Sequence, residues 1–427
     1  MTETAATAEK SSRVARRRPS EASRWHMSRQ AVNLSLTEIQ AMTEADCHEY
    51  FVKLHFGSRE TVRCAHCGTV SRHYWRALEN RWKCKCCGKS FSVTSGTVFA
   101  NRKKSFKFHL TAALLWANSA AGQPALELKR HLDTTYNAAY VLQHKLREGL
   151  LRGYNQGLLA GDIEMDGAHQ SGWRSAEKRG RPQVTRPADP LATESPYDDA
   201  LLTHGSRAKA RHRAKRKEGE TAEGGKDPDF GRKLPKDRRI VFAVRVRSGK
   251  PGRGASCTRV AVGLSETAEV AEAVLAQFVA IPESILNTDT ASAYQSIGKR
   301  FKAHHTVEHS KMLVGPNGEN NNQAESFNFR MDRAEKGVHL NIEPKYLLDY
   351  SVEMAFREDT RRLPNGRQME LALSVALRVG RSLFWRGYTR GHHRTVELTH
   401  PLPRPAPASG PPKGRNPFRS QALRPPR

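Results

Sequence analysis

The strongest constraint on this sequence is a set of four cysteines arranged in two Cys-x-x-Cys pairs. The pairs are Cys64-Ala-His-Cys67 and Cys84-Lys-Cys-Cys87, with sixteen residues between them. Each pair is typical of a tight turn that points two thiolates at one ion, and Gly68 and Gly88 follow where such turns need a positive φ. The spacing predicts a structural zinc ribbon whose closed tetrahedral site is made by Cys64, Cys67, Cys84 and Cys87.

The chain is strongly basic, with a formal net charge of +28 over 427 residues and a sequence pI of about 10.1. This charge indicates a polyanionic partner, above all nucleic acid. No stretch approaches the ~18 apolar residues of a membrane helix, and the N-terminus lacks the apolar core of a secretory signal peptide. We therefore expect no membrane partner and a cytoplasmic, nucleoid-associated protein whose cysteines bind metal rather than form disulfides.

Cys86 and His66 lie inside the cysteine cluster and are alternative ligands. A closed site needs only four ligands, so we expect both to be solvated neighbours of the metal. Such a site has no open coordination position, so catalysis must lie elsewhere in the chain. The ribbon is then expected to present its basic residues to DNA: Arg81, Lys83, Lys85 and Lys89.

Composition and periodicity divide the chain into segments. Residues 1–34 are expected to form a disordered basic tail, and 35–100 a short helix followed by the zinc ribbon. Residues 101–155 read as three helices. The last two, joined at Asp133-Thr134, favour a helix-turn-helix, although any helical hairpin gives the same pattern. The polar and aromatic residues of its second helix are Tyr136, Tyr140, His144, Lys145 and Arg147.

Residues 156–360 have the pattern of a mixed α/β sheet, interrupted at 171–237 by a long basic insert without apolar periodicity. The predicted order is strand, insert, strand, strand, helix, strand, short strand, helix. This is the layout of an RNase H-like domain. Residues 361–427 are expected to form a C-terminal extension that is disordered from about residue 398.

Two predicted strands each carry an aspartate at their end. Asp166 closes Ile163-Glu-Met-Asp and is followed by Gly167, while Asp289 closes Leu286-Asn-Thr-Asp. Adjacent strand-end carboxylates can bridge divalent metals ~3.5–4 Å apart, and Mg²⁺ prefers such oxygen ligands. Glu164 shares the face of Asp166 by alternation and is a supporting or competing group. The candidates for a third ligand are Glu319, Asn322, Glu325 and Asp332.

With these motifs in place, the chain resembles bacterial insertion-sequence transposases that carry an N-terminal zinc ribbon and a DDE-type RNase H-like domain (the insertion-sequence family fifteen-ninety-five, ISXO-like). The resemblance covers about residues 36–360. It rests on WKCKCCGKSFSVTSGTVFANRKK, IEMDGAHQSG, LNTDTASAY, HHTVEHS and NNNQAESFNFRMDR. The residues that depart from the family pattern are Gly167-Ala168, where an acidic and a small residue are usual, and the long insert.

The resemblance implies that Asp166 and Asp289 are the first two acidic residues of the catalytic site. The family's Asn-x-x-Glu pattern is matched by Asn322-Gln-Ala-Glu325, and its following basic residue by Arg333 or Arg330. Because two divalent ions need negative charge, we expect Glu325 to be the ligand and Asn322 a weak ligand or a neighbour. The competing interpretation is that Glu325 only complements the dipole of a helix start.

The resulting hypothesis is a transposase that cleaves and joins DNA with Mg²⁺ or Mn²⁺ and holds Zn²⁺ in its ribbon. Its expected partners are the terminal inverted repeats and the target DNA, bound by a homo-oligomer. An inactive DNA-binding regulator and an RNase H-like nuclease are the alternatives.

Overall fold

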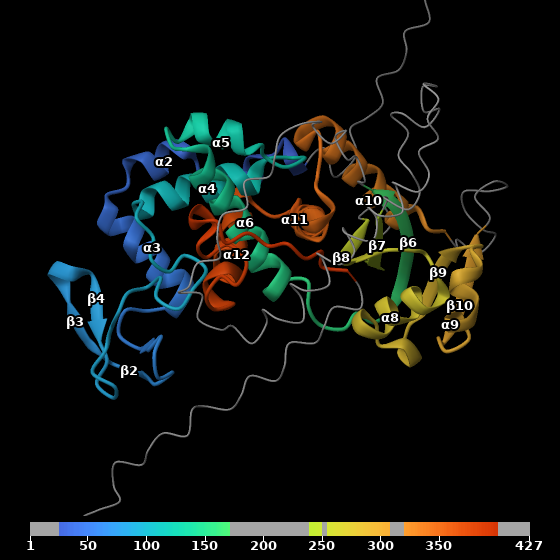
Figure 1. Cartoon of the computed structure of the whole chain (residues 1–427), viewed down its shortest axis with the longest axis horizontal. Helices are drawn as coiled ribbons and strands as arrows, with labels where there is room; N and C mark the ends of the chain where they lie inside the picture. Colours follow the sequence, from blue (N-terminus) through green and yellow to red (C-terminus); the bar gives the residue numbers. More distant parts are fainter. Residues whose placement is uncertain (1–24, 171–238, 250–253, 308–319, 400–427) are drawn as a thin grey trace, which may run out of the picture.

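The computed structural model describes residues 25–170, 239–249, 254–307 and 320–399. Of the tail predicted over residues 1–34, residues 1–24 lie outside the described residues. The rest is ordered rather than disordered, with a 3-10 helix at Arg29–Ala31 and Leu34 only 8% exposed. The basic insert 171–237 and the tail from residue 400 also lie outside the described residues. Small β-strands lie at one end of the molecule, helices occupy the middle, and a larger sheet lies at the other end (Figure 1). The helices of the described segments include none with both the length and the hydropathy of a membrane span.

Two short helices precede the ribbon, and each starts at a capping box. Ser35 exchanges hydrogen bonds with Glu38, and Thr43 with Asp46, so the first orphan N–H groups of both helices are satisfied. The second helix ends at Gly57, whose φ of +81° suits a glycine. The elements are α2 (Leu36–Ala41), α3 (Glu44–Phe56), β1 (Val62–Arg63), β2 (Val70–Ser71), β3 (Tyr74–Arg76), β4 (Arg81–Lys83) and β5 (Ser90–Phe91).

The ribbon packs its aromatic face on α3. Strands β3, β4 and β5 pair antiparallel, with Trp75 opposite Trp82 and Trp82 opposite Phe91. The ring of Trp82 is 1% exposed and meets Phe56 of α3 edge to face at 5.6 Å. Alternation along β3 and β4 therefore turns the other face of the ribbon, which carries the charged residues, toward solvent.

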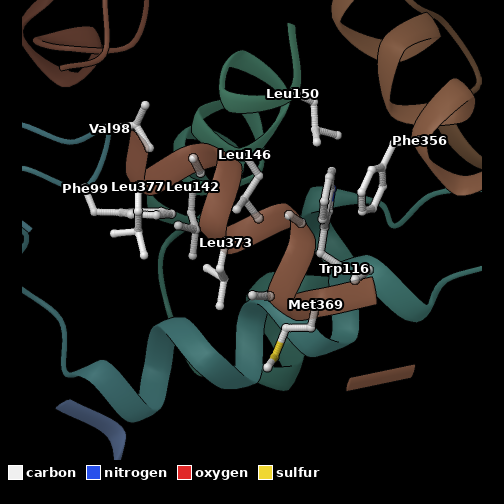
Figure 2. Close-up of a cluster of buried hydrophobic side chains, with 14 of the residues drawn as sticks. Val98, Phe99, Trp116, Leu142, Leu146, Leu150, Phe356, Met369, Leu373 and Leu377 are labelled. Atoms are coloured by element: carbon white, nitrogen blue, oxygen red, sulfur yellow. The ribbon is translucent and has the colours of Figure 1, made fainter. Parts of the chain in front are cut away.

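Helices from distant parts of the sequence share one core. They are α4 (Phe106–Asn118), α5 (Ala125–His131), α6 (Tyr136–Gly153), α11 (Leu347–Thr360) and α12 (Asn365–Arg378). Figure 2 shows Trp116 beside Phe356 and the side chains of α6 facing Met369, Leu373 and Leu377 of α12. Residues 361–378 therefore belong to the central core rather than to a peripheral extension, because the apolar residues of α12 recur on one helical face.

A buried ion-pair network joins α4, α6 and α11. Glu353 accepts from Arg147 at 2.5 Å and from Arg357 at 2.5 Å, and Arg357 also donates to the Trp116 carbonyl oxygen at 2.6 Å. Burial alone would raise the pKa of Glu353, but the two guanidinium groups hold it at about 2. Since all three charges are paired, the network fixes the helices at a defined separation.

Two of the polar residues expected on the DNA-facing side of the predicted helix-turn-helix are buried. In α6, His144 and Arg147 are both 0% exposed, and His144 stacks on Trp385 at 4.1 Å. These side chains serve the core instead of a solvent face. Tyr136, at the start of α6, remains 44% exposed.

The larger sheet has five strands in the order β10-β9-β6-β7-β8. Its β6–β7 and β7–β8 pairs are antiparallel, whereas β9 runs parallel to β6 and to β10. This order confirms the predicted RNase H-like fold. The strands are β6 (Asp162–Gln170), β7 (Arg239–Arg247), β8 (Ala255–Gly263), β9 (Ile285–Asp289) and β10 (Ala303–Val307).

Helices cover both faces of this sheet. α8 (Ala268–Phe278), which is capped by the Thr267 side chain, packs its apolar side on one face. α10 (Asn322–Ala334) and α11 pack on the other, where Val241 and Ala243 join the helical core. The sheet therefore buries α8 on one side and carries the helix with the predicted third ligand on the other.

We expect Leu373→Ala to lower the free energy of unfolding by about 2–5 kcal/mol, because it removes a fully buried side chain from the centre of the core. Leu383→Ala, at a side chain that is 52% exposed, should change it by less than about 0.5 kcal/mol. Urea unfolding followed by tryptophan fluorescence measures both. Equal effects of the two variants would contradict the placement of α12.

Candidate active site and four-cysteine cluster

The four predicted cysteines come together at the ribbon. Their ligand atoms all lie within 4.8 Å of one another, with Cys64 and Cys87 sulfurs 3.8 Å apart and Cys67 and Cys84 sulfurs 3.6 Å apart. Tetrahedral zinc with bonds of about 2.3 Å needs sulfur separations of about 3.8 Å, so the cluster fits that ion.

Backbone turns position these thiols. The N–H groups of His66 and Cys86 point at the sulfurs of Cys64 and Cys84, at 3.4 and 3.3 Å. Gly68 and Gly88 have φ of +76° and +70°, as their positions after the turns require. The described structure places neither Cys86 nor His66 in the cluster, since Cys86 is exposed and the His66 ring lies 3.2 Å from the Ser90 carbonyl oxygen.

Purified protein should contain about one zinc ion per chain. We expect Cys64→Ser to lose that zinc and to expose the ribbon aromatic residues, because a structural site contributes directly to folding. Elemental analysis checks the metal content. The matched control is Cys86→Ser, which should retain zinc. Absence of zinc from wild type, or full retention in Cys64→Ser, would refute the site.

Asp166 lies within β6 rather than at its end. The strand runs on through Gln170 beside β7, so the expectation that it stops at Asp166 was wrong. On its other side, however, β6 pairs with β9 only from Asp162 to Glu164. Asp166 therefore lies just past the end of the parallel pairing, where a polar side chain can remain half-buried.

Asp289 lies at the end of β9, beside Asp166. The parallel register pairs Glu164 with Asn287, and its extension by two residues brings Asp166 opposite Asp289. In parallel strands, residues in register point to the same face. The backbone turns away immediately after β9, where the Ala291 N–H donates to the Asp289 carboxylate at 3.0 Å.

Glu164 of β6 binds the start of α10 through hydrogen bonds. Its side chain is 0% exposed and accepts from the backbone N–H groups of Gln323 and Ala324, at 2.7 and 3.1 Å. Its other oxygen accepts from Arg247 at 2.6 Å. Glu164 thus satisfies the free N–H groups of the helix end, and is a supporting residue rather than a competing metal ligand.

Asn328 fixes α10 at a second point. Its side-chain amide donates to an oxygen of Asp166 at 2.7 Å. Two strand residues span about 6.6 Å and four helical residues about 6 Å, so α10 can contact Glu164 with Ala324 and Asp166 with Asn328. Asn328 was not among the predicted site residues, although it continues the three-residue spacing of Asn322 and Glu325.

Glu325 lies on the exposed side of this first turn, between those two attachment points. Its charge acts on Asp166 and raises the pKa of that carboxyl group. Asn322 is half-buried at the first position of the helix, and its backbone N–H contacts the Asn320 side chain at 3.3 Å. Glu325 is thus an acidic residue of α10 whose charge contributes, after burial, to the raised pKa of Asp166.

A fourth carboxylate, absent from the sequence predictions, approaches from the end of β8. Glu266 accepts from the Tyr294 hydroxyl at 2.6 Å, and a side chain at Gly167 would place its Cβ 2.7 Å from a Glu266 oxygen. Burial raises the pKa of Glu266, and the charge of Asp289 raises it further. The glycine at 167 signals such a close approach, but only the fold reveals the partner.

These acidic groups repel one another. Burial, followed by the charges of Asp289, Glu266 and Glu325, raises the pKa of Asp166 to about 6, although the Asn328 hydrogen bond opposes the shift. In the described residues no three of these carboxylates bring an oxygen each within 4.8 Å of one another, unlike the thiols. The donor set is oxygen-rich and negatively charged, so it suits Mg²⁺ or Mn²⁺ spaced along the edge of the sheet.

The remaining predicted residues of α10 divide between structural and exposed positions. Arg330 pairs with Glu358 of α11, and Asp332 pairs with Lys336 at 2.6 Å, so neither side chain is directed to the carboxylates. Arg333 is exposed and lies over the ring of Phe329, at 4.6 Å from its centroid. Glu319 lies outside the described residues.

Comparison with protein families is consistent with this geometry. Residues 197–359 match the family model described as the ISXO2-like transposase domain. That segment is therefore similar to an ISXO2-like transposase domain, in agreement with the resemblance drawn from the sequence. The matched segment contains Asp289, Asn322, Glu325 and Arg333, whereas Asp166 and the cysteines precede it. Searches of curated proteins and of solved structures gave no match.

Asp166→Asn should stabilise the metal-free protein in a pH-dependent manner. The folded pKa of Asp166, about 6, exceeds the value of about 3.9 in an unfolded chain, so ionisation lowers stability as the pH rises through 6. In EDTA we expect the variant to gain on the order of 1–2 kcal/mol at pH about 8 and almost nothing at pH about 4.

Urea denaturation at the two pH values measures this effect. Asp332→Asn is the control, because its surface carboxylate pairs with Lys336 and should contribute little at either pH. If the difference in free energy of unfolding between Asp166→Asn and wild type does not change with pH, the ionised form of Asp166 is not disfavoured by its surroundings.

Proposed function

We propose that this protein is a DDE-type transposase that binds the inverted-repeat ends of an insertion sequence and catalyses metal-dependent cleavage and strand transfer. The observation that carries the proposal is the approach of Asp166, Asp289 and Glu325 at one edge of an RNase H-like sheet. The family of the domain makes DNA the expected substrate.

In this proposal Asp166 and Asp289 would hold the metal ions, and Glu325 of α10 would be the third acidic ligand. Asn328 orients the Asp166 carboxylate through its hydrogen bond. Mg²⁺ or Mn²⁺, when bound, supplies the positive charge that activates the attacking water or 3′-hydroxyl and stabilises the leaving oxygen. Asn322 is a weak ligand or a neighbour, because an amide brings no charge to the ions.

The ribbon offers a surface for the phosphate backbone. Tyr74 lies opposite Lys83 and Arg76 opposite Arg81, and all four side chains are exposed. Arg76 pairs with Glu79 at 3.0 Å, and Arg81 and Lys83 place further positive charge on the same exposed face, where a polyanion could bind. Lys85 and Lys89 add positive charge near the cysteine cluster. The affinity of the ribbon for DNA should therefore fall as the salt concentration rises.

The proposal includes an assembly in which two DNA ends meet, and hence a homo-oligomer on DNA. A cytoplasmic, nucleoid-associated location follows from a chromosomal substrate. The four cysteines would hold Zn²⁺ as a structural ion, apart from the reacting phosphate.

A strand-transfer assay with Mg²⁺ or Mn²⁺, on DNA taken from the inverted repeats that flank the reading frame, tests the function. Wild type should join ends to target DNA. Asp166→Asn and Glu325→Gln should lose more than about 100-fold in rate, and Asn322→Ala about 10–100-fold, the range of groups that support metal ligands.

Each alternative predicts a different result. Nicking without joining would indicate a nuclease, and binding without either reaction a DNA-binding regulator. Equal joining by wild type and Asp166→Asn would show that the catalytic assignment is wrong. A larger loss in Asn322→Ala than in Glu325→Gln would reassign the third ligand.

A further inference from the structure

Phe329 is an apolar residue in an unusual place. Of the phenylalanines in the described residues, it is the one that is exposed, with 59% of its surface accessible. The opposite side of α10 packs normally, since Phe327 and Met331 are 0% exposed. Phe329 is therefore not needed to hold the helix on the sheet, and exposing its ring to water is unfavourable.

The ring lies in a row with two residues of the candidate site. Glu325, Phe329 and Arg333 follow one another at four-residue spacing and are all exposed, so they form one stripe along α10. The residue before Phe329 is Asn328, which contacts Asp166 directly. The stripe therefore starts at the carboxylates and leads away from them.

Arg333 holds the ring in a defined position. Its guanidinium carbon lies 4.6 Å from the ring centroid, a cation–π contact that covers one face of the ring. With 59% of its surface accessible, the residue still has room for a planar partner. An aromatic face beside an arginine is the arrangement that stacks on nucleobases, whereas a metal ion or a phosphate alone would not need the ring.

We propose that Phe329 stacks on a nucleobase of the bound DNA, one or two nucleotides from the phosphate held at Asp166, Asp289 and Glu325. Four helical residues rise about 6 Å, close to two stacking steps of about 3.4 Å along one DNA strand. Arg333 contacts the neighbouring phosphate from the same stripe. The stacked base leaves its place in the duplex, which opens the DNA at the reacting end. This inference rests on the proposed function.

The probe is a set of duplexes taken from the flanking inverted repeat, each with a fluorescent purine analogue at a different position near the cut. Binding is measured in Ca²⁺. At one position, wild type should increase the fluorescence, because the base leaves the duplex stack. Phe329→Ala should lose that increase and bind about 5- to 100-fold more weakly.

Matched variants separate stacking from packing. Phe329→Trp should restore both signals, whereas Phe329→Leu, which is apolar but not planar, should not. Leu158→Ala, at an apolar side chain that is 64% exposed before β6, should behave as wild type. A duplex lacking the base at the sensitive position should weaken wild type but leave Phe329→Ala unchanged.

The outcomes distinguish this inference from the proposed function. If wild type joins DNA and Phe329→Ala binds and joins equally well, stacking by Phe329 is refuted while the transposase proposal stands. If wild type binds and unstacks a base through Phe329 but never joins ends, the stacking proposal stands and the catalytic one fails. Absence of any binding to these duplexes by wild type refutes both.

Discussion

The Glu164 carboxylate accepts hydrogen bonds from two backbone N–H groups at the start of α10. It also forms an ion pair with Arg247 of β7. The carboxylate is fully buried, and it lies two residues before Asp166 on the same face of β6. One strand thus provides both the group that attaches the helix and the group at the centre of the acidic site. Loss of one partner from such a buried ion pair costs about 3–5 kcal/mol, so the attachment is strong.

The position of Glu325 follows from that attachment. With its first turn fixed at Glu164 and its second at Asp166 through Asn328, α10 has little freedom to rotate. Glu325 lies between these points, on the side that faces solvent. Its negative charge at a helix start is also favourable with the helix dipole, so the structural and the metal-binding interpretations are compatible. The acidic groups repel one another, and a bound cation would reduce that repulsion.

Much of this arrangement could be predicted from local sequence patterns. The Cys-x-x-Cys spacing and the order of strands and helices are local signals, and both the cysteine cluster and the RNase H-like sheet are present. The contributions of Glu266 and Asn328 could not be predicted, because they depend on contacts between elements far apart in the chain. The continuation of β6 past Asp166 was also missed, since Gly167 was taken as a strand end when it instead leaves space for Glu266.

In the helical region, residue types suggested a DNA-binding role for side chains that are in fact buried. The polar residues of α6 have the types that bind DNA, yet His144 and Arg147 are buried by α11 and by the segment that includes Trp385. Residue type alone does not distinguish a DNA-reading arginine from one that neutralises a buried glutamate, here Glu353. The segment after residue 360, assigned to an extension by composition, provides α12 of that core.

The most direct test of the central claim is a crystal structure with Mn²⁺, using anomalous scattering to locate the metal. We expect manganese at the edge of the sheet, within about 2.1–2.2 Å of oxygens from both Asp166 and Asp289, with the Glu325 side chain turned toward it. Manganese bound elsewhere, or bound there with Glu325 remaining in solvent, would contradict the proposal that α10 completes the site.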